Sequence, residues 1–130
     1  MMGGELVVAV ALIERGERYF LQRRDLCSRR FAGLWEFPGG KLELGETPEQ
    51  ALLRELGEEL QWSPEELTAL PLLEHTYPDL KVAIHPFHCK GGGQLRTDLP
   101  WGWFSARALQ RLQMPDATRV LANALPGNRR

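Results

Sequence analysis

The stretch from residue 47 to residue 60 constrains the fold more than any other part of the chain, because it specifies both the start and the faces of a helix. It opens with Thr47, Pro48 and, at the third helical position, Gln50, which is the pattern of a capping box with proline in the first helical place. At about 100° per residue, four leucines share one face and three glutamates share the opposite one. They are Leu52, Leu53, Leu56 and Leu60, and Glu55, Glu58 and Glu59. We therefore predict an amphipathic helix with one packed face and one acidic face.

The acidic face lowers the stability of this helix. Carboxylates three and four residues apart repel each other by roughly 0.2–0.5 kcal/mol per pair, and Gly57 costs about 1 kcal/mol relative to Ala inside a helix. One interpretation is a solvated surface with Arg54 as the ion-pair partner. The other is a site for a hard divalent cation, since Mg²⁺ is commonly held by a few carboxylates together with substrate phosphates. The order of residues around the helix favours the second interpretation.

The rest of the chain alternates strand and helix patterns, which predicts a mixed α/β domain built in layers. Residues 6–13 are apolar and β-branched, and with residues 19–24 they predict a hairpin. Further strands are expected at 34–37, 70–76, 81–89 and 101–104, and further helices at 105–112, with Ser105 as a cap, and at 117–125. Pro38, Gly39 and Gly40 together predict a turn. Three helices would then accompany the sheet.

Composition narrows the class of protein. At 130 residues, with 43% hydrophobic and 25% charged residues, the chain suits one globular domain covering residues 1–130. A net charge of −1 gives no general attraction to nucleic acid or to an anionic membrane, so we expect neither a duplex partner nor a membrane partner. Cys27 and Cys89 are too few for a disulfide framework, and the apolar segment near the N-terminus lacks a cleavage site. We expect a cytoplasmic protein, either a monomer or a homodimer.

The spacing around the acidic helix carries the strongest functional signal. Gly40 is followed by five residues and Glu46, then by seven residues and the run RELGEELQW, residues 54–62. This pattern resembles the Nudix box, G-x5-E-x7-R-E-U-x-E-E-x-G-U with U apolar, over residues 40–62. The wider run EFPGGKLELGETPEQALLRELGEEL, residues 36–60, is similar to the MutT branch of that family. The resemblance implies the Nudix fold, in which a mixed β-sheet is sandwiched between helices in α/β/α layers.

One box position departs from the pattern, since Gln61 stands where the family has glycine. A glycine there would suit a left-handed helix terminus, and a residue with a Cβ costs about 1–2 kcal/mol in that conformation. We therefore expect the exit of this helix to differ from that of the family.

The resemblance also implies a mechanism and a cofactor. In the family, residues matching Glu55, Glu58 and Glu59 supply metal ligands and the proton acceptor, and the backbone carbonyl matching Gly39 is a further ligand. The metal would be Mg²⁺, with Mn²⁺ as a possible substitute, and repulsion between the carboxylates and a polyphosphate makes it obligatory. Residues matching Glu46 and Arg54 hold loop and helix together through an ion pair. MutT-like enzymes attack the β-phosphorus and release a nucleoside monophosphate and pyrophosphate.

Several further residues match the nucleotide pocket of the family. The matching side chains are Arg24, Glu36, Phe37, Pro38 and Asp79, and Arg29 or Arg30 could reach phosphate. Gly39 and Gly40 permit a close backbone approach that a Cβ would block. The late acidic metal ligand of the family falls on Thr97 here, so the adjacent Asp98 is the candidate.

Base preference is left open by two substitutions. MutT-like enzymes that select oxidised guanine use an Asn near the last helix, whereas this chain offers Asp116, with Ala117 at the matching place. The position that supplies an Arg after Tyr-Pro-Asp in MutT is Leu80. The resemblance implies hydrolysis of nucleoside triphosphates, with 8-oxo-dGTP as one candidate substrate and DNA-repair sanitation as its role. Cytidine nucleotides, ADP-ribose, dinucleoside polyphosphates or a catalytically silent nucleotide sensor are the alternatives.

Overall fold

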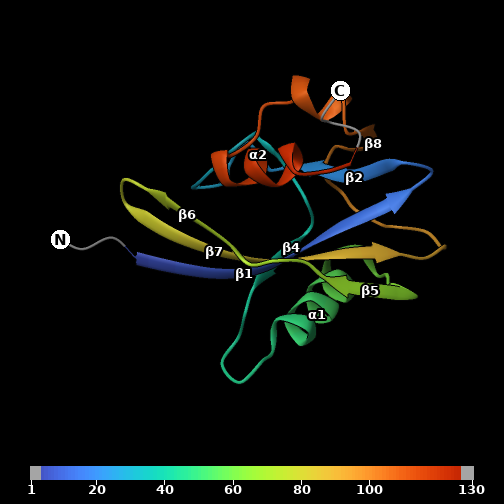
Figure 1. Ribbon diagram of the computed structural model, residues 1–130, viewed down its shortest axis with the longest axis horizontal. Helices are drawn as coiled ribbons and strands as arrows, with labels where there is room; N and C mark the ends of the chain where they lie inside the picture. Colours follow the sequence, from blue (N-terminus) through green and yellow to red (C-terminus); the bar gives the residue numbers. More distant parts are fainter. Residues whose placement is uncertain (1–3, 127–130) are drawn as a thin grey trace.

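The computed structural model describes residues 4–126, which form a mixed β-sheet with helices on both of its sides (Figure 1). The strands are β1 Gly4–Arg15, β2 Arg18–Arg23, β3 Trp35–Glu36, β4 Gly39–Lys41, β5 Glu66–Ala69, β6 Leu73–Tyr77, β7 Leu80–Lys90 and β8 Trp101–Ser105. The helices are α1 Pro48–Leu60, the short 3₁₀ helix η1 Ala108–Arg111, and α2 Asp116–Asn123. In Figure 1, α1 lies below the sheet and α2 above it, which confirms the predicted α/β/α layers.

Strand β1 organises the sheet because it has three partners. It runs parallel to β7 from the pair Gly4↔Leu80 to the pair Ile13↔Cys89, and antiparallel to β4. Its last two residues turn away to pair with β2. The strand order is β3-β2-β1-β7-β5, with β4 also on β1, β6 also on β7 and β8 also on β2. The middle of β1 therefore lies directly beside the short strand β4.

The alternation of side chains along β1 divides the core in two. Ala9, Ala11 and Ile13 pack with the leucine face of α1, while Leu12 packs on the other side of the sheet with α2 and η1. The helical partners in the two clusters are Leu52, Leu56 and Leu60 of α1, Leu109 of η1, and Leu121 of α2. Each helix is thus held on its own side by a separate apolar cluster.

Helix α1 begins as the sequence predicts. The hydroxyl of Thr47 accepts a hydrogen bond from the Gln50 backbone N–H at 3.1 Å, and the Gln50 side chain accepts one from the Thr47 N–H at 3.0 Å. The buried face differs slightly, because Ala51 is buried and Leu53 is exposed. The start of the helix is therefore fixed by local chemistry, in a position that points its acidic face toward β4.

The expectation of a different helix exit is wrong. Gln61 adopts the left-handed conformation, with φ 50° and ψ 45°, and its backbone N–H donates to the carbonyl of Gly57. Burial of the next residue, Trp62, and the hydrogen bond from its indole N–H to the Gly92 carbonyl at 2.7 Å hold the chain on this path. Tertiary contacts therefore impose a conformation that glutamine itself disfavours.

Three other segments differ from the sequence-based expectations, at residues 38–40, 70–76 and 105–112. The segment predicted as a turn at residues 38–40 instead contributes Gly39 and Gly40 to β4. The strand expected at 70–76 forms only from Leu73, as β6, and the separate strand β5 precedes it. The break between them contains Pro71, which has no N–H to donate to a sheet.

The helix expected at 105–112 is shorter than predicted. The Ser105 hydroxyl accepts a hydrogen bond from the Ala108 N–H at 3.1 Å, but the N-cap residue of the helix is Arg107, which makes no side-chain cap hydrogen bond, and only η1 forms. The chain leaves the helical path because the Gln113 carbonyl accepts a hydrogen bond from the Trp35 N–H of β3 at 2.8 Å. Two α-helices rather than three therefore accompany the sheet in residues 4–126.

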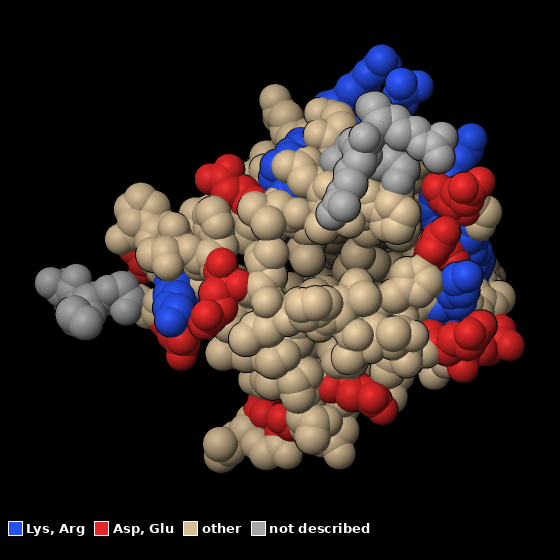
Figure 2. Space-filling view, viewed as in Figure 1, with Lys and Arg blue, Asp and Glu red and all other residues tan. Residues whose placement is uncertain are grey.

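Charged side chains gather around the edge of the face drawn in Figure 2, and its centre is uncharged. Basic and acidic side chains lie side by side at its left and right edges, while the lower edge carries acidic ones. Cys27 is exposed and Cys89 is buried, and the two are unpaired. None of the helices within residues 4–126 combines the length and the apolar character needed to cross a membrane.

Candidate active site

The candidate site begins where β4 meets β1, because two glycines allow an approach that other residues would block. A Cβ on Gly39, whose φ is 149°, would lie 2.1 Å from the carbonyl oxygen of Ala9. A Cβ on Gly40 would lie 2.3 Å from the carboxyl carbon of Glu55. The pair of glycines thus lets β4 dock on β1 and lets the Glu55 carboxylate of α1 lie directly against the β4 backbone.

Arg54 binds the loop before α1 to the acidic face of the helix. Its guanidinium donates to both carboxylate oxygens of Glu46, with Nε to Oε2 at 2.7 Å and Nη2 to Oε1 at 3.0 Å. It also donates to the Lys41 carbonyl at 3.0 Å, to Glu55 at 3.0 Å and to Glu58 at 3.2 Å. The hydrogen bond from Arg54 lowers the pKa of Glu46, and Glu46 in turn raises the pKa of Arg54. The predicted Glu46–Arg54 ion pair is therefore present, and the same guanidinium reaches two of the three glutamates predicted as metal ligands.

Glu59, which follows Glu58 on α1, is the third glutamate of the acidic face. Its carboxylate accepts a hydrogen bond from the Gly39 N–H at 3.3 Å. Although the residue as a whole is exposed, its carboxyl end is crowded by protein atoms, and this desolvation raises the pKa of Glu59 to about 7. The Gly39 N–H opposes the increase, while the nearby charges of Glu55 and Glu36 add to it. A cation beside Glu59 would reverse this effect.

The arrangement fits a hard cation, although no three His, Cys, Asp or Glu side chains of residues 4–126 lie close enough together to hold a metal as they stand. Oxygen ligands are the type that Mg²⁺ takes. Glu55 and Glu58 share the positive charge of Arg54, and the crowded Glu59 carboxyl has no ion-pair partner among the described residues. Because Gly39 and Gly40 have no Cβ, their backbone lies close to these carboxylates, and the Glu55 carboxylate lies against Gly40.

A cavity of about 360 Å³ extends from these residues along the sheet. At one end it is lined by Glu59, Gly39, Gly40 and the ion pair between Arg24 and Glu36, whose nitrogen and oxygen are 2.9 Å apart. Burial raises the pKa of Glu36, and the charge of Arg24 opposes that shift. The size is typical of a site for a small molecule.

The rest of the cavity wall is mostly apolar and aromatic. It is formed by side chains of β1, β6, β7, α2 and the segment between β2 and β3, namely Leu6, Val8, Val10, Phe31, Tyr77, Val82, Ile84, Ala117, Thr118 and Leu121. Of these, Val8 and Val10 lie beside β4, opposite Lys41 and Gly39. The Tyr77 hydroxyl accepts a hydrogen bond from the Ala117 N–H at 3.0 Å, which ties α2 to β6. A ligand in this cavity would place its charged part near Glu59 and its apolar part among these residues.

Most of the predicted site residues are brought together by the fold. Arg24, Glu36, Phe37, Gly39 and Gly40 line the cavity, whereas Pro38 is fully buried and does not line it. Asp79 is bound to Arg30 through both of its carboxylate oxygens.

Three predicted residues lie apart. Asp116, at the start of α2, is exposed and is not among the residues lining the cavity, where Ala117 and Thr118 are found instead. Asp98 is also exposed, and the adjacent Thr97 hydrogen-bonds to Gln22 at 2.9 Å rather than turning to the acidic face. Arg29 is exposed and does not line the cavity.

Sequence reasoning missed Phe31, Tyr77, Lys41 and Thr118, all of which line the cavity. For Tyr77 a signal was available, because it precedes Pro78 and Asp79 at a turn between two strands. Phe31 gave no such signal, since its position depends on a left-handed backbone with φ 60° in a segment without regular structure.

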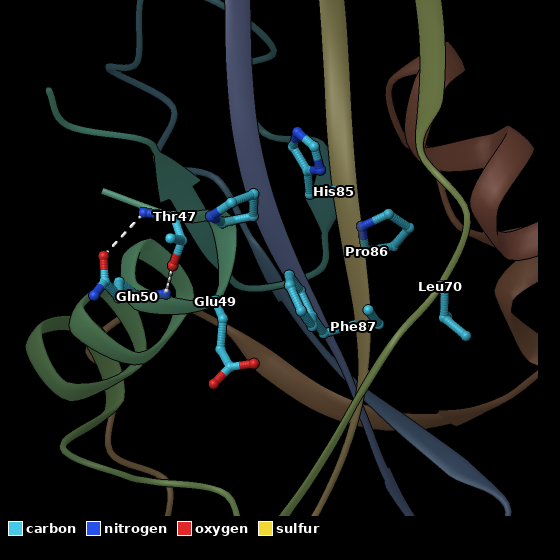
Figure 3. A pocket seen from close by; sticks show the side chains of 9 residues that line it. Thr47, Glu49, Gln50, Leu70, His85, Pro86 and Phe87 are labelled. Atoms are coloured by element: carbon cyan, nitrogen blue, oxygen red, sulfur yellow. Dashed lines mark hydrogen bonds between the residues drawn. The ribbon is translucent and has the colours of Figure 1, made fainter. Parts of the chain in front are cut away.

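A second cavity, of about 510 Å³, lies at the N-terminus of α1 next to β5 and β7 (Figure 3). Thr47 and Gln50 are on its wall, and the two hydrogen bonds drawn there are those of the capping box. Two of its polar side chains are thus used to begin the helix, and none of Glu55, Glu58 and Glu59 lines it.

Comparison with known proteins supports the resemblance noted in the sequence. The family model of the NUDIX domain matches residues 5–125. An 8-oxo-dGTP diphosphatase of Proteus vulgaris is 42% identical over 81 residues, which is 62% of this chain and 71% of that protein. A CTP pyrophosphohydrolase of Escherichia coli K12 is 53% identical over 53 residues, or 41% of this chain and 38% of that protein. The crystal structure of a MutT NUDIX hydrolase from Burkholderia pseudomallei superposes with a TM-score of 0.80 at 28% identity, covering 92% of this chain and 96% of that one.

Proposed function

The chain belongs to the Nudix hydrolase family and is MutT-like, and we propose that it hydrolyses nucleoside triphosphates to a nucleoside monophosphate and pyrophosphate. One observation carries this proposal. Glu59 lines a cavity whose other end is apolar and aromatic, and Glu55 lies against the same β4 backbone. The cavity therefore offers a polyphosphate end and a nucleobase end in one continuous space.

Nudix hydrolases generally use a divalent metal, and here we propose Mg²⁺, with Mn²⁺ as a possible substitute. Glu55, Glu58, Glu59 and the carbonyl of Gly39 would hold it. When bound, the ion would neutralise phosphate oxygens and lower the pKa of the attacking water. Asp98 is the remaining candidate ligand, and its side chain is exposed.

The protein's own groups have separate tasks in this mechanism. Water attacks the β-phosphorus, a carboxylate of the acidic face accepts its proton, and the bond to the α-phosphate oxygen breaks as the monophosphate leaves. Arg54 keeps Glu55 and Glu58 in place through its hydrogen bonds to them and to Glu46. Arg24, which lines the cavity at the same end as Glu59, would supply a positive charge to the substrate.

Two substrates have particular support. The relative named 8-oxo-dGTP diphosphatase favours an oxidised guanine nucleotide and a role in removing it before DNA synthesis. Ala117 stands where an Asn reads the base in MutT-like enzymes, and Asp116 lies outside the cavity wall, which favours a cytidine nucleotide instead. The relative named CTP pyrophosphohydrolase supports this second candidate.

The setting of the enzyme is also a proposal. The two unpaired cysteines suit a cytoplasmic location. The interspersed charges on the face in Figure 2 offer no broad basic surface there for a nucleic-acid duplex, so we propose free nucleotides as the partner, bound by a monomer or a homodimer.

A substrate panel tests these alternatives. It contains 8-oxo-dGTP, dGTP, CTP, ADP-ribose and a diadenosine polyphosphate, each with Mg²⁺ and with a chelator. We expect Mg²⁺-dependent pyrophosphate release, at the highest kcat/KM, from 8-oxo-dGTP or from CTP. Cleavage of only the two diphosphate-linked compounds would keep the Nudix chemistry and reject the triphosphate proposal. Binding without turnover for every compound would instead indicate a sensor.

A further inference from the structure

Arg30 closes the aromatic end of the cavity through an ion pair that joins two distant segments. Its Nη1 donates to Asp79 Oδ2 at 2.8 Å and its Nη2 to Asp79 Oδ1 at 2.8 Å. Arg30 lies in the segment between β2 and β3, and Asp79 lies in the turn between β6 and β7. Two parallel hydrogen bonds fix both the distance and the orientation of the two groups, so they hold these segments in one relative position.

The same guanidinium is packed on two aromatic rings. Its central carbon is 5.0 Å from the centre of the Phe31 ring and 5.4 Å from that of Tyr77, and the two rings are 5.3 Å apart. Phe31 reaches this place from a left-handed backbone, which a residue other than glycine rarely adopts. The contacts of Arg30 with Asp79 and Tyr77 compensate for that strained conformation.

Arg30, Phe31 and Tyr77 all line the cavity, at the end away from Glu59. Leu80, which stands where the MutT pattern has an Arg, instead packs against the apolar cluster that includes Leu121.

We propose that Arg30 determines nucleobase binding, and that it supplies from the β2–β3 segment the guanidinium that position 80 lacks. This inference rests on the proposed function. Arg30 holds Phe31 and Tyr77 as one wall against which a flat aromatic ring packs. The ligand class is therefore a nucleobase that packs on this wall, and the polyphosphate is bound independently of Arg30.

Kinetics of three variants test the role of Arg30. Arg30→Ala should raise KM for the preferred nucleoside triphosphate about 10-fold or more and leave kcat within about twofold, since Arg30 lies away from the acidic face of α1. The KM of Arg30→Lys should lie between those of the wild type and Arg30→Ala, because an ammonium cannot make the paired hydrogen bonds to Asp79. The neighbouring Arg29→Ala is the matched control and should leave both constants unchanged.

Inorganic triphosphate separates base binding from general damage to the fold. As a competitive inhibitor without a base, it should have the same Ki for the wild type and for Arg30→Ala. Asp79→Ala should raise KM as Arg30→Ala does, and the double variant should be no worse than either single one.

The outcomes distinguish this inference from the function on which it rests. If the wild type hydrolyses a nucleoside triphosphate but Arg30→Ala has the KM of Arg29→Ala, the role of Arg30 is rejected and the function stands. An equal rise in KM and in the Ki of inorganic triphosphate would also reject it, because the whole site would then be disturbed. A wild type without activity on any nucleoside triphosphate would reject the function first and this inference with it.

Discussion

At the scale of single residues, Arg54 is the group on which the site depends. It donates to Glu46, Glu55 and Glu58 and to the carbonyl of Lys41, so one side chain links the loop before α1, the strand β4 and the acidic face. The like charges of that face would otherwise repel each other. The cost of crowding carboxylates on one helix is therefore offset partly by a guanidinium built into the same helix.

Replacing Glu46 tests this link through its dependence on pH. Arg54 lowers the pKa of Glu46 in the folded protein, so its stabilising effect is present above the ordinary pKa of a glutamate and is lost as the pH falls through the lowered value. Glu46→Gln should therefore lower the urea midpoint at pH 7, and the gap to the wild type should narrow in acid. Urea denaturation at a series of pH values measures this, with Glu49→Gln, which lacks a guanidinium contact among the described residues, as the control. A difference in urea midpoint between the wild type and Glu46→Gln that stays constant down to the lowest pH measured would contradict this prediction.

Residue identities in the site were predictable to the extent that their spacing is local. Glu46, Arg54 and the three glutamates lie within one loop and one helix, and the structure brings Glu46, Glu55 and Glu58 to Arg54. The aromatic wall was not predictable in the same way. Phe31 and Tyr77 meet only because distant segments fold together, and the Arg30–Asp79 pair that joins them spans 49 residues.

At the scale of elements, α1 combines a well-specified start with an unfavourable end. The capping box fixes the start, but Gln61 is held in a left-handed conformation at the exit. The Cβ of glutamine makes the left-handed backbone conformation unfavourable. The contacts of Trp62 hold the chain in that conformation at the end of the helix.

Gln61→Gly should stabilise the protein by about 1 kcal/mol, because glycine has no Cβ to disfavour the left-handed conformation. The greater conformational freedom of glycine in the unfolded chain reduces this gain. Thermal or urea unfolding at neutral pH measures the change. Gln61→Ala keeps the Cβ and serves as the control, so it should give no increase. Equal stability of the two variants would show that the left-handed exit costs nothing here.

Elements with a strong local sequence signal formed as predicted, whereas elements that depend on tertiary contacts differed from the prediction. The hairpin of β1 and β2, the helix α1 and the strand β7 have clear apolar periodicity and formed as predicted. Strand β4 has the composition of a turn and becomes a strand only because its glycines fit against β1. Likewise, η1 stops early because the chain must reach β3 to pair with Trp35.

At the scale of the whole molecule, the two helical layers have different tasks. One side of the sheet carries α1 with its acidic face, and the other carries α2, whose Ala117, Thr118 and Leu121 line the apolar end of the cavity. The cavity meets the acidic group where β4 lies beside β1. A substrate bound along it would therefore contact both layers.

This arrangement predicts that metal binding stabilises the folded chain even without nucleotide. Mg²⁺ at about 100 times its dissociation constant would add roughly 2.7 kcal/mol, and the thermal midpoint should rise accordingly and return on chelation. Glu59→Gln should show a smaller rise, whereas Glu49→Gln, on the same helix but at the second cavity, should behave as the wild type. Equal shifts in all three proteins would place the ion away from the acidic face.

The turnover of Glu55→Gln tests the central claim most directly, because Gly40 and Arg54 hold the Glu55 carboxylate against β4. Pyrophosphate release from the preferred nucleoside triphosphate is measured with Mg²⁺ for the wild type, Glu55→Gln and Glu49→Gln, with circular dichroism to confirm that each is folded. We predict that Glu55→Gln stays folded and loses activity on the order of 10²-fold or more, while Glu49→Gln keeps it. Full activity in a folded Glu55→Gln would contradict the assignment of the acidic face of α1 as the active site.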